Sequence, residues 1–353
     1  MDNARSLTKT DDVIPNSGKH VQNNKPSMVA FSIEDSWEQI TGIDTLHCVD
    51  ECGGIFYDNF NEFWVPPLDR TLLLKISKTN PYHGPIVFSR KNMAAELIQL
   101  SPLLDRENLE AALYNYLLFG DCPLLKMRNG FGKVTRLIAL SSVWTRVKKD
   151  GNFAYLQRNG DHITYRTEDV IFLKQYDPFQ QIYGVPDYMG GLQSAQLNTD
   201  ATLFRRKYYK NGAHCGFIFY ATDPNLDADK EQELQTAIAG SKGVGNFRSL
   251  FVNIPDGKPD GIKIIPVGDI ATKDDFTNIK SVTSQDMLAA HRFPPGLSGI
   301  IPVGTSSFGD PLKSDEAYRK NESTPLARKF VETINKDPEI KGNNMLTLAT
   351  PTT

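Results

Sequence analysis

The stretch that decides the fold runs from Tyr183 to Ile300, beginning YGVPDY (183–188) and ending HRFPPGLSGI (291–300). A helix is predicted after Gly184-Val185-Pro186. It should run to Lys210, because the glycine of Asn211-Gly212 supplies the left-handed conformation of a helix C-cap. A second helix is predicted from about Thr272 to His291, where Pro294-Pro295 prevents its continuation. At 1.5 Å per residue the two span roughly 37 and 30 Å. Two long helices joined by about sixty residues indicate an antiparallel pair with a module at its tip.

The faces of the first long helix are unusually small and polar for a core helix. Its large apolar residues are interspersed with glycine, alanine and threonine. These apolar residues are Met189, Leu192, Leu203, Phe204 and Tyr208. Such a helix packs closely on neighbours over several faces, and copies of the chain in a ring would supply those neighbours. A surface helix of a monomer is the alternative.

The composition indicates a soluble protein of two or three domains. With 353 residues the chain is long enough for a sizeable core, and its net charge of −3 excludes a polycation that coats nucleic acid. No apolar run approaches the roughly 20 residues that cross a bilayer, and the first residues lack the apolar core of a signal peptide. Four cysteines in so long a chain argue against a disulfide scaffold, and no second ligand cluster completes a zinc site with Cys48 and Cys52. We therefore expect reduced thiols and no metal.

The chain is expected to begin with a disordered arm at residues 1–30 and an irregular stretch from Phe31 to Trp64, after which it becomes helical. Helices are predicted over Leu68–Lys78 and Pro85–Leu100. A third should begin at a cap on Asp105 and end at Gly120, because apolar residues recur between them at three- and four-residue spacing.

Residues 122–176 change to a strand pattern. The pairs Asn129-Gly130, Asp150-Gly151 and Asn159-Gly160 mark tight turns, since both residue types tolerate positive φ. The predicted strands are Leu124–Arg128, Val134–Leu140, Phe153–Gln157, His162–Arg166 and Val170–Leu173. A small antiparallel sheet beside a helical layer makes this an α+β domain.

The module between the long helices is predicted to be a small α/β unit. Its elements are strands at 216–221, 249–254 and 262–267 and a helix at 226–239. After Pro295 the residues 296–311, GLSGIIPVGTSSFGDP, are too rich in glycine and proline for a regular element. Helix returns over about 312–334, and the polar tail from Asn335 is expected to be loose.

No catalytic constellation or cofactor site is predicted. In residues 240–245, GSKGVG, a helix precedes the loop and no Ser or Thr follows Lys242, so the phosphate-loop pattern fails. The acidic pairs Asp274-Asp275 and Asp315-Glu316 each point in different directions on a helix. His291, at the end of the second long helix, is interpreted as a packing or capping residue.

Two stretches remain as candidate binding residues. A dense basic patch is formed by Arg205, Arg206, Lys207 and Lys210. It is either a solvated cluster that complements the helix dipole, or a contact with DNA phosphates or a neighbouring copy. The glycine-bounded loop combines apolar and small polar residues, namely Ile301, Val303, Gly304, Thr305, Ser306, Ser307 and Phe308.

Several segments, in this order, resemble the portal proteins of tailed bacteriophages, specifically the PBSX-type group. They are YGVPDY (183–188), ATLFRRKYYKNGAHCGFIFY (201–220), SKGVGNFRSLF (241–251), DGIKIIPVG (260–268), DMLAAHRFPPGLSGIIP (286–302) and FGDPLKSDEAYRKNESTPL (308–326). The resemblance covers roughly Trp64 to Ile334.

The resemblance implies a portal-type subunit. Its parts would be a wing (31–186), two antiparallel stem helices (187–211 and 269–292), a clip between them (212–268), a tunnel loop (293–311), a C-terminal wing or crown helix (312–335) and a polar tail (336–353). Such subunits form a ring, usually of twelve copies, at one capsid vertex. Double-stranded DNA passes through the ring without sequence-specific recognition.

The implied partners are other copies of the chain, the terminase large subunit, major capsid and scaffolding proteins, and head-completion or tail proteins, with no membrane. The implied location is the virion, after assembly in the host cytoplasm. ATP hydrolysis would belong to the terminase, so the chain itself is expected not to be an enzyme. Two alternatives stay open: a metal-dependent DNA-processing enzyme using Asp274 and Asp275, and a monomeric capsid adaptor.

Overall fold

The computed structural model describes residues 55–210, 217–221, 262–266, 273–298 and 310–349. The N-terminal arm, most of the residues between the long helices and residues 299–309 of the glycine-bounded loop lie outside this part of the chain. The prediction that 296–311 contains no regular element is wrong at its two ends, because a short helix, α9, covers Pro295–Ser298 and α10 begins at Pro311. The predicted strand 249–254 and helix 226–239 therefore lie outside the described residues.

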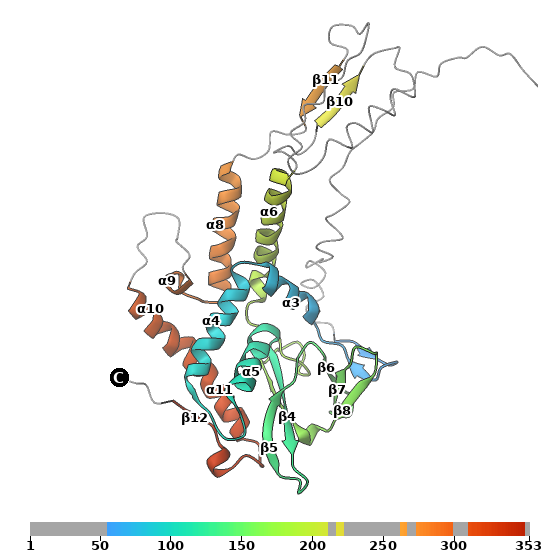
Figure 1. Cartoon of the computed structure of the whole chain (residues 1–353), viewed down its shortest axis with the longest axis vertical. Coiled ribbons are helices and arrows are strands. Elements are labelled where there is room, and N and C mark those ends of the chain that lie inside the picture. Colours follow the sequence, from blue (N-terminus) through green and yellow to red (C-terminus); the bar gives the residue numbers. More distant parts are fainter. Residues whose placement is uncertain (1–54, 211–216, 222–261, 267–272, 299–309, 350–353) are drawn as a thin grey trace, which may run out of the picture. The chain divides into compact units, whose positions relative to one another are not determined.

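Three helices form the first layer (Figure 1). A polar side chain begins each of the first two. Asp69 Oδ1 accepts hydrogen bonds from Thr71 N and Leu72 N at the start of α3 (Arg70–Thr79). Asn80 ends α3, and its Oδ1 accepts from the backbone N–H groups of Tyr82 and His83 at the start of α4 (His83–Glu96). One buried asparagine thus closes one helix and opens the next.

The third helix, α5 (Arg106–Phe119), is the one that the sequence predicts best. Asp105 caps it by accepting from Asn108 N at 2.8 Å, and Gly120 ends it with φ +83°. A Cβ at Gly120 would lie 2.4 Å from the backbone of Val185, so close packing as well as φ demands glycine here. The predicted cap and stop are both confirmed.

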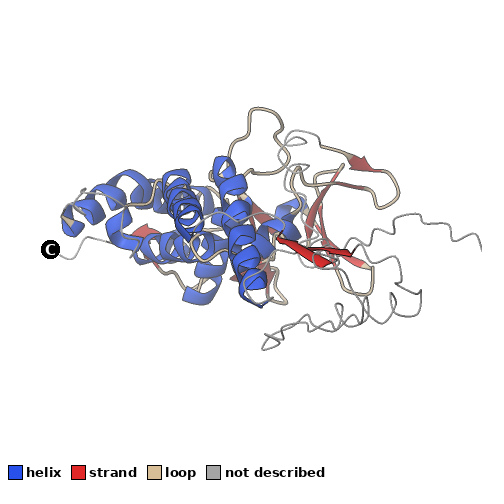
Figure 2. Ribbon diagram, turned by 90° about the horizontal axis from the view of Figure 1, so that it is seen from above, coloured by secondary structure: helices blue, strands red, loops and turns tan. Residues whose placement is uncertain are grey.

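The strands beside these helices form two sheets, whereas the sequence predicts one sheet. In the first, β4 (Asp121–Arg128) lies between β5 (Val134–Ala139) and β9 (Val170–Lys174), all antiparallel. The second has the order β1 (Tyr57–Asp58), β2 (Phe63–Trp64), β6 (Thr145–Lys148), β7 (Phe153–Leu156), β8 (His162–Tyr165). Figure 2 shows the strands in red beside the helices in blue.

The prediction of one sheet is wrong because local turns fix only neighbouring strands. The chain leaves the first sheet at the end of β5, and β6 pairs instead with β2 from the other end of the domain. A small apolar cluster of Leu125, Leu140, Phe153 and Val170 joins the two sheets. Pairing between strands so distant in sequence leaves no local signal.

The C-terminal helix is interrupted. It consists of α10 (Pro311–Tyr318), a π-helical turn (Arg319–Ser323) and α11 (Thr324–Asn335). Phe330 of α11 packs edge-to-face on Tyr116 of α5, and both rings are buried in the main core. The prediction of a helix over about 312–334 is therefore correct in extent, but it did not include the π-helical turn.

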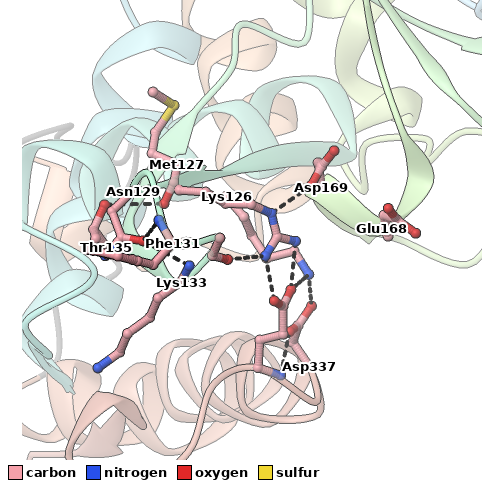
Figure 3. Close-up of polar contacts among 12 residues, drawn as sticks. Lys126, Met127, Asn129, Phe131, Lys133, Thr135, Glu168, Asp169 and Asp337 are labelled. Atoms are coloured by element: carbon pink, nitrogen blue, oxygen red, sulfur yellow. Dashed lines mark hydrogen bonds and ion pairs between the residues drawn. The ribbon is translucent and has the colours of Figure 1, made fainter.

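The expectation of a loose tail after Asn335 is wrong for residues 336–349. Ile340 and Leu346 are each only 2% exposed in the main core, and β12 (Thr347–Leu348) pairs with β3 (Ile98–Gln99). Lys126 Nζ of β4 contacts Asp337 Oδ2 at 2.8 Å and Glu339 Oε2 at 2.7 Å (Figure 3). The prediction failed because the mostly polar tail contains two apolar residues that are buried in the core and two acidic residues that pair with the buried Lys126.

Between the long helices, β10 (Phe217–Ala221) and β11 (Ile262–Pro266) form an antiparallel pair from Phe217 opposite Pro266 to Ala221 opposite Ile262. These two strands match the predictions for 216–221 and 262–267.

Candidate functional site

The two long helices are α6 (Leu192–Lys210), which follows the 3-10 turn Met189–Gly191, and α8 (Lys273–Ala290). They lie side by side in opposite directions (Figure 1). The seam between them is narrow, because a Cβ on Gly191 would lie 2.6 Å from Ala290 Cβ. Asn198 Nδ2 donates to Thr283 Oγ1 at 2.6 Å, and Ser194 Oγ donates to Asp286 Oδ2 at 2.8 Å. The glycine that the sequence singles out at the start of the first helix thus allows the close approach, whereas the hydrogen bonds come from Ser194 and Asn198, which it does not single out.

The outward faces of the pair remain uncovered. Leu197 of α6 is 51% exposed and Val282 of α8 is 58% exposed. On α8 the exposed strip continues through Gln285 and Ala289 to a cavity of about 330 Å³. The cavity is lined by Gln285, Leu288, Ala289, Arg292, Phe293, Pro294 and Pro295.

The lower end of the helix pair, which we call the foot, is held by a partly buried polar network. Arg90 of α4 donates from both terminal nitrogens to Asp187, at 3.1 and 2.7 Å. Arg292, just after α8, donates to the same carboxylate at 2.5 Å. The two long helices are therefore fastened to α4 and to each other through Asp187.

The charges at the foot are stable over a wide pH range. Burial alone would raise the pKa of Asp187, but the hydrogen bonds and charges of Arg90 and Arg292 outweigh it and lower the pKa to about 2. The Asp187 carboxylate is consequently ionised at neutral pH.

His291 is fully buried at the foot, beside His83 of α4. The interpretation of His291 as a packing residue is confirmed: its ring lies 5.1 Å from the rings of both His83 and Tyr188. Burial first, then the charges of His83 and Arg90, lower its pKa to about 2.

The structure describes only part of the predicted basic patch. Arg205 and Arg206 are exposed, and no described acidic residue forms an ion pair with either. The side chains of Lys207 and Lys210 lie outside the description. So do all the predicted loop residues from Ile301 to Phe308, and the side chains of Asp274 and Asp275.

The sequence interpretation missed the foot. Arg90, Asp187, Arg292 and Glu322 come from four separate segments, and nothing in their local spacing relates them. The one local hint was an arginine directly before Phe293-Pro294-Pro295, where the helix has to stop.

In the part of the chain that the structure describes, no three His, Cys, Asp or Glu side chains gather as metal ligands. Within the same residues, no helix combines the length and apolar character needed to cross a bilayer.

A model of the phage portal protein family matches residues 101–344, more than half of the chain. The chain belongs to the phage portal protein family. Portal proteins are structural components of the capsid and not enzymes, so the DNA-processing alternative falls away.

Comparison with individual portal proteins agrees. The probable portal protein of Haemophilus phage HP1 is 49% identical over 324 residues, which are 90% of this chain and 94% of the relative. A crystal structure of an HK97 family phage portal protein from Corynebacterium diphtheriae has a TM-score of 0.57 at 11% identity, covering 79% of this chain and 98% of that one. The neck of a native gene transfer agent particle, computed with C12 symmetry, contains a chain with a TM-score of 0.55 at 15% identity, covering 86% and 88%. These two likenesses extend the portal protein assignment to the fold.

Proposed function

We propose that this portal protein forms a closed ring of twelve copies at one capsid vertex, through which double-stranded DNA is packaged and ejected. We assign it to the PBSX-type group, on the segments quoted above. The twelvefold symmetry of the gene transfer agent neck supports the copy number. The ring is a virion component, assembled in the bacterial cytoplasm.

In this proposal, α6 and α8 belong to the stem (187–211 and 269–292), and β10 and β11 belong to the clip (212–268). Residues 31–186 with 312–335 form the wing, and residues 293–311 form the tunnel loop. The tail 336–349 joins the wing, since Ile340 and Leu346 are buried in its core.

The observation that carries the ring is the uncovered face of the stem. Each subunit buries one seam between α6 and α8 and leaves Leu197 and Val282 on the outside. A neighbour related by rotation about the ring axis would cover the face that carries Leu197 and Val282. That contact is heterologous, and it closes into a ring when the rotation is a whole fraction of a turn.

DNA passes through this ring without sequence-specific recognition. The small basic patch that begins at Arg205 and Arg206 and the net charge of −3 favour weak contacts with phosphate over a tight grip. The terminase large subunit, major capsid and scaffolding proteins, and head-completion or tail proteins are the proposed partners.

Light scattering of the purified protein tests the ring. The 39.5 kDa chain gives about half a megadalton if twelve copies assemble, and about 40 kDa for a monomeric adaptor. A mass that stays at 40 kDa at all concentrations would refute the ring.

Cysteine cross-linking tests the proposed contact. Leu197→Cys with Val282→Cys, in a chain whose Cys48, Cys52 and Cys215 are serine, should give a ladder of covalent oligomers on oxidation. Leu197→Cys alone is the matched control and should give none. If the double-cysteine variant has the mass of a ring but gives no ladder, or if the single-cysteine control gives one instead, the subunit contact lies elsewhere.

Deleting Val303–Phe308 tests the tunnel loop. Rings of normal mass with impaired DNA packaging or retention are expected, whereas normal DNA-filled heads would remove the assigned role.

A further inference from the structure

Arg292 has a backbone conformation that is usual for glycine. Helix α8 ends in a Schellman motif, in which Phe293 N donates to Leu288 O at 2.8 Å and Arg292 N donates to Ala289 O at 2.9 Å. Arg292 occupies the left-handed position of this motif with φ +53°. A residue with a Cβ is strained there, so a side-chain contact has to compensate for the absence of glycine.

The Arg292 side chain joins two carboxylates from different segments. It donates to Asp187 Oδ2 at 2.5 Å and, from two nitrogens, to Glu322 at 2.7 and 3.0 Å. Asp187 precedes α6, whereas Glu322 belongs to the π-helical turn between α10 and α11. The arginine therefore connects the foot of the long helices to this turn.

The π-helical turn has a local cause, Pro325. Proline has no N–H, and within an α-helix its ring would clash with the carbonyl of Asn321, four residues earlier. The turn widens before the proline, and Thr324 N donates to Arg319 O, five residues earlier. Single turns of this kind are frequent at functional sites.

A second contact joins the same two places. Tyr318, the last residue of α10, packs edge-to-face on Phe293 with ring centroids 5.1 Å apart. Both rings are buried, together with Leu288 and Ile86. An ionic contact and an aromatic contact thus hold α10 and the turn against the end of α8.

We propose that Arg292 is a strap that fixes the orientation of α10 relative to the end of α8, by holding Glu322 on the π-helical turn. With the strap in place, a displacement of α8 is transmitted to α10 through the π-helical turn that Pro325 introduces. Since α10 directly follows residues 299–309, the strap would couple the stem to the base of the tunnel loop, a step that rests on the proposed function.

Arg292→Gly separates this role from helix termination, because glycine is the best residue for the backbone conformation. Hydrogen exchange of the full-length protein is the measurement. We expect amides of residues 311–323 to exchange about fivefold faster in the variant, with α8 and α11 unchanged. If Arg292 only ends the helix, exchange over 311–323 stays within twofold of wild type, which would overturn the proposal.

Glu322→Gln keeps the shape of the turn and removes the charge, so it should reproduce the local increase in exchange. Arg319→Gln is the matched control: it breaks the ion pair with Asp315 within the same helix and leaves the strap intact, so exchange should stay within twofold of wild type. Should Arg292→Gly loosen the whole chain, the Glu322→Gln result decides: a local increase supports the strap and no change refutes it.

Packaging by Glu322→Gln rings tests the functional step on its own. Reduced packaging with rings intact is expected. Normal packaging together with faster local exchange would keep the strap and refute its coupling to the tunnel loop. A chain of monomer mass would refute the ring and leave the exchange test valid.

Discussion

Nδ1 of His83 lies 2.9 Å from Nε2 of His291, and both side chains are fully buried. On the other side of the pair, Arg90 Nη1 lies 3.1 Å from His291 Nδ1. A guanidinium only donates, so His291 Nδ1 must accept and its proton must be on Nε2. That proton is donated to His83 Nδ1, which places the His83 proton on its own Nε2. The hydrogen bonds therefore run in one direction, from Arg90 through His291 to His83.

This chain makes the protein sensitive to acid. Burial and the charge of Arg90 lower the pKa of His83 to about 4, and the pKa of His291 is about 2, whereas unfolded histidine titrates near 6.5. Below pH 6.5 the unfolded chain binds protons that the folded chain does not, so stability falls as pH falls. Each histidine should reduce the free energy of unfolding by about 2 kcal/mol between pH 7 and 5.

Urea unfolding at the two pH values measures this loss. The variant His83→Asn retains an acceptor for His291 and should lose about 2 kcal/mol less than wild type between pH 7 and 5. Exposed His162 provides the control, and His162→Gln should behave as wild type. Equal losses in wild type and His83→Asn would contradict the assignment of neutral rings at the foot.

A buried ion pair between Arg70 and Asp121 joins α3 to β4, and Arg70 also donates to Ser142 O. Asp121→Asn leaves the guanidinium buried without its counter-charge. We expect a loss of about 3 kcal/mol in the free energy of unfolding. Replacing both residues, as Arg70→Met with Asp121→Asn, should cost less than the two single changes together. Additive losses would show that the two charges do not stabilise each other.

A comparison of Gly120 with Gly132 distinguishes the cost of a positive φ from the cost of a steric clash. Both have positive φ, +83° and +78°, but a Cβ at Gly132 would have no atom within 4 Å. Gly132→Ala should therefore cost about 1 kcal/mol from φ alone. Gly120→Ala would also force apart the backbone at Val185, and we expect at least about 3 kcal/mol or failure to fold. Similar melting temperatures for the two variants would contradict the close packing at Gly120.

The C-terminal residues give a similar matched pair. Leu346 is 2% exposed and Leu348, two residues later, is 36% exposed. Leu346→Ala should cost about 3 kcal/mol through an internal cavity, and Leu348→Ala less than about 1 kcal/mol. Urea unfolding compares them. If both changes were silent, residues 336–349 would not belong to the core in solution.

How much of the structure could be predicted from the sequence depends on how far apart in the chain the interacting residues are. Asp105 and Gly120 act within a few residues of α5, so its two ends were predictable from local capping rules. The antiparallel pair α6 and α8 followed from length and stop signals. The pairing of β6 with β2 and of β12 with β3 joins residues more than 80 and 200 positions apart in the chain, which no local pattern records.

The foot was hidden for a different reason. Arg90, Asp187 and Arg292 each resemble ordinary surface charges in the sequence, and only the fold brings them together. Even the π-helical turn has a visible cause in Pro325, but a proline near the start of a new helix is equally common. The family resemblance supplied the order of the parts without the contacts that hold them.

The contact between Asp187 and Arg292 means that the chain leaves and rejoins the layers around α4 and α5 at one point. Everything between these two residues is, in topological terms, an insertion with a closed neck. The segment is not a passive addition, because Tyr188, Leu192 and Met287 at its two ends are buried in one cluster with residues of α3 and α5, so the layers below could not keep their core without it.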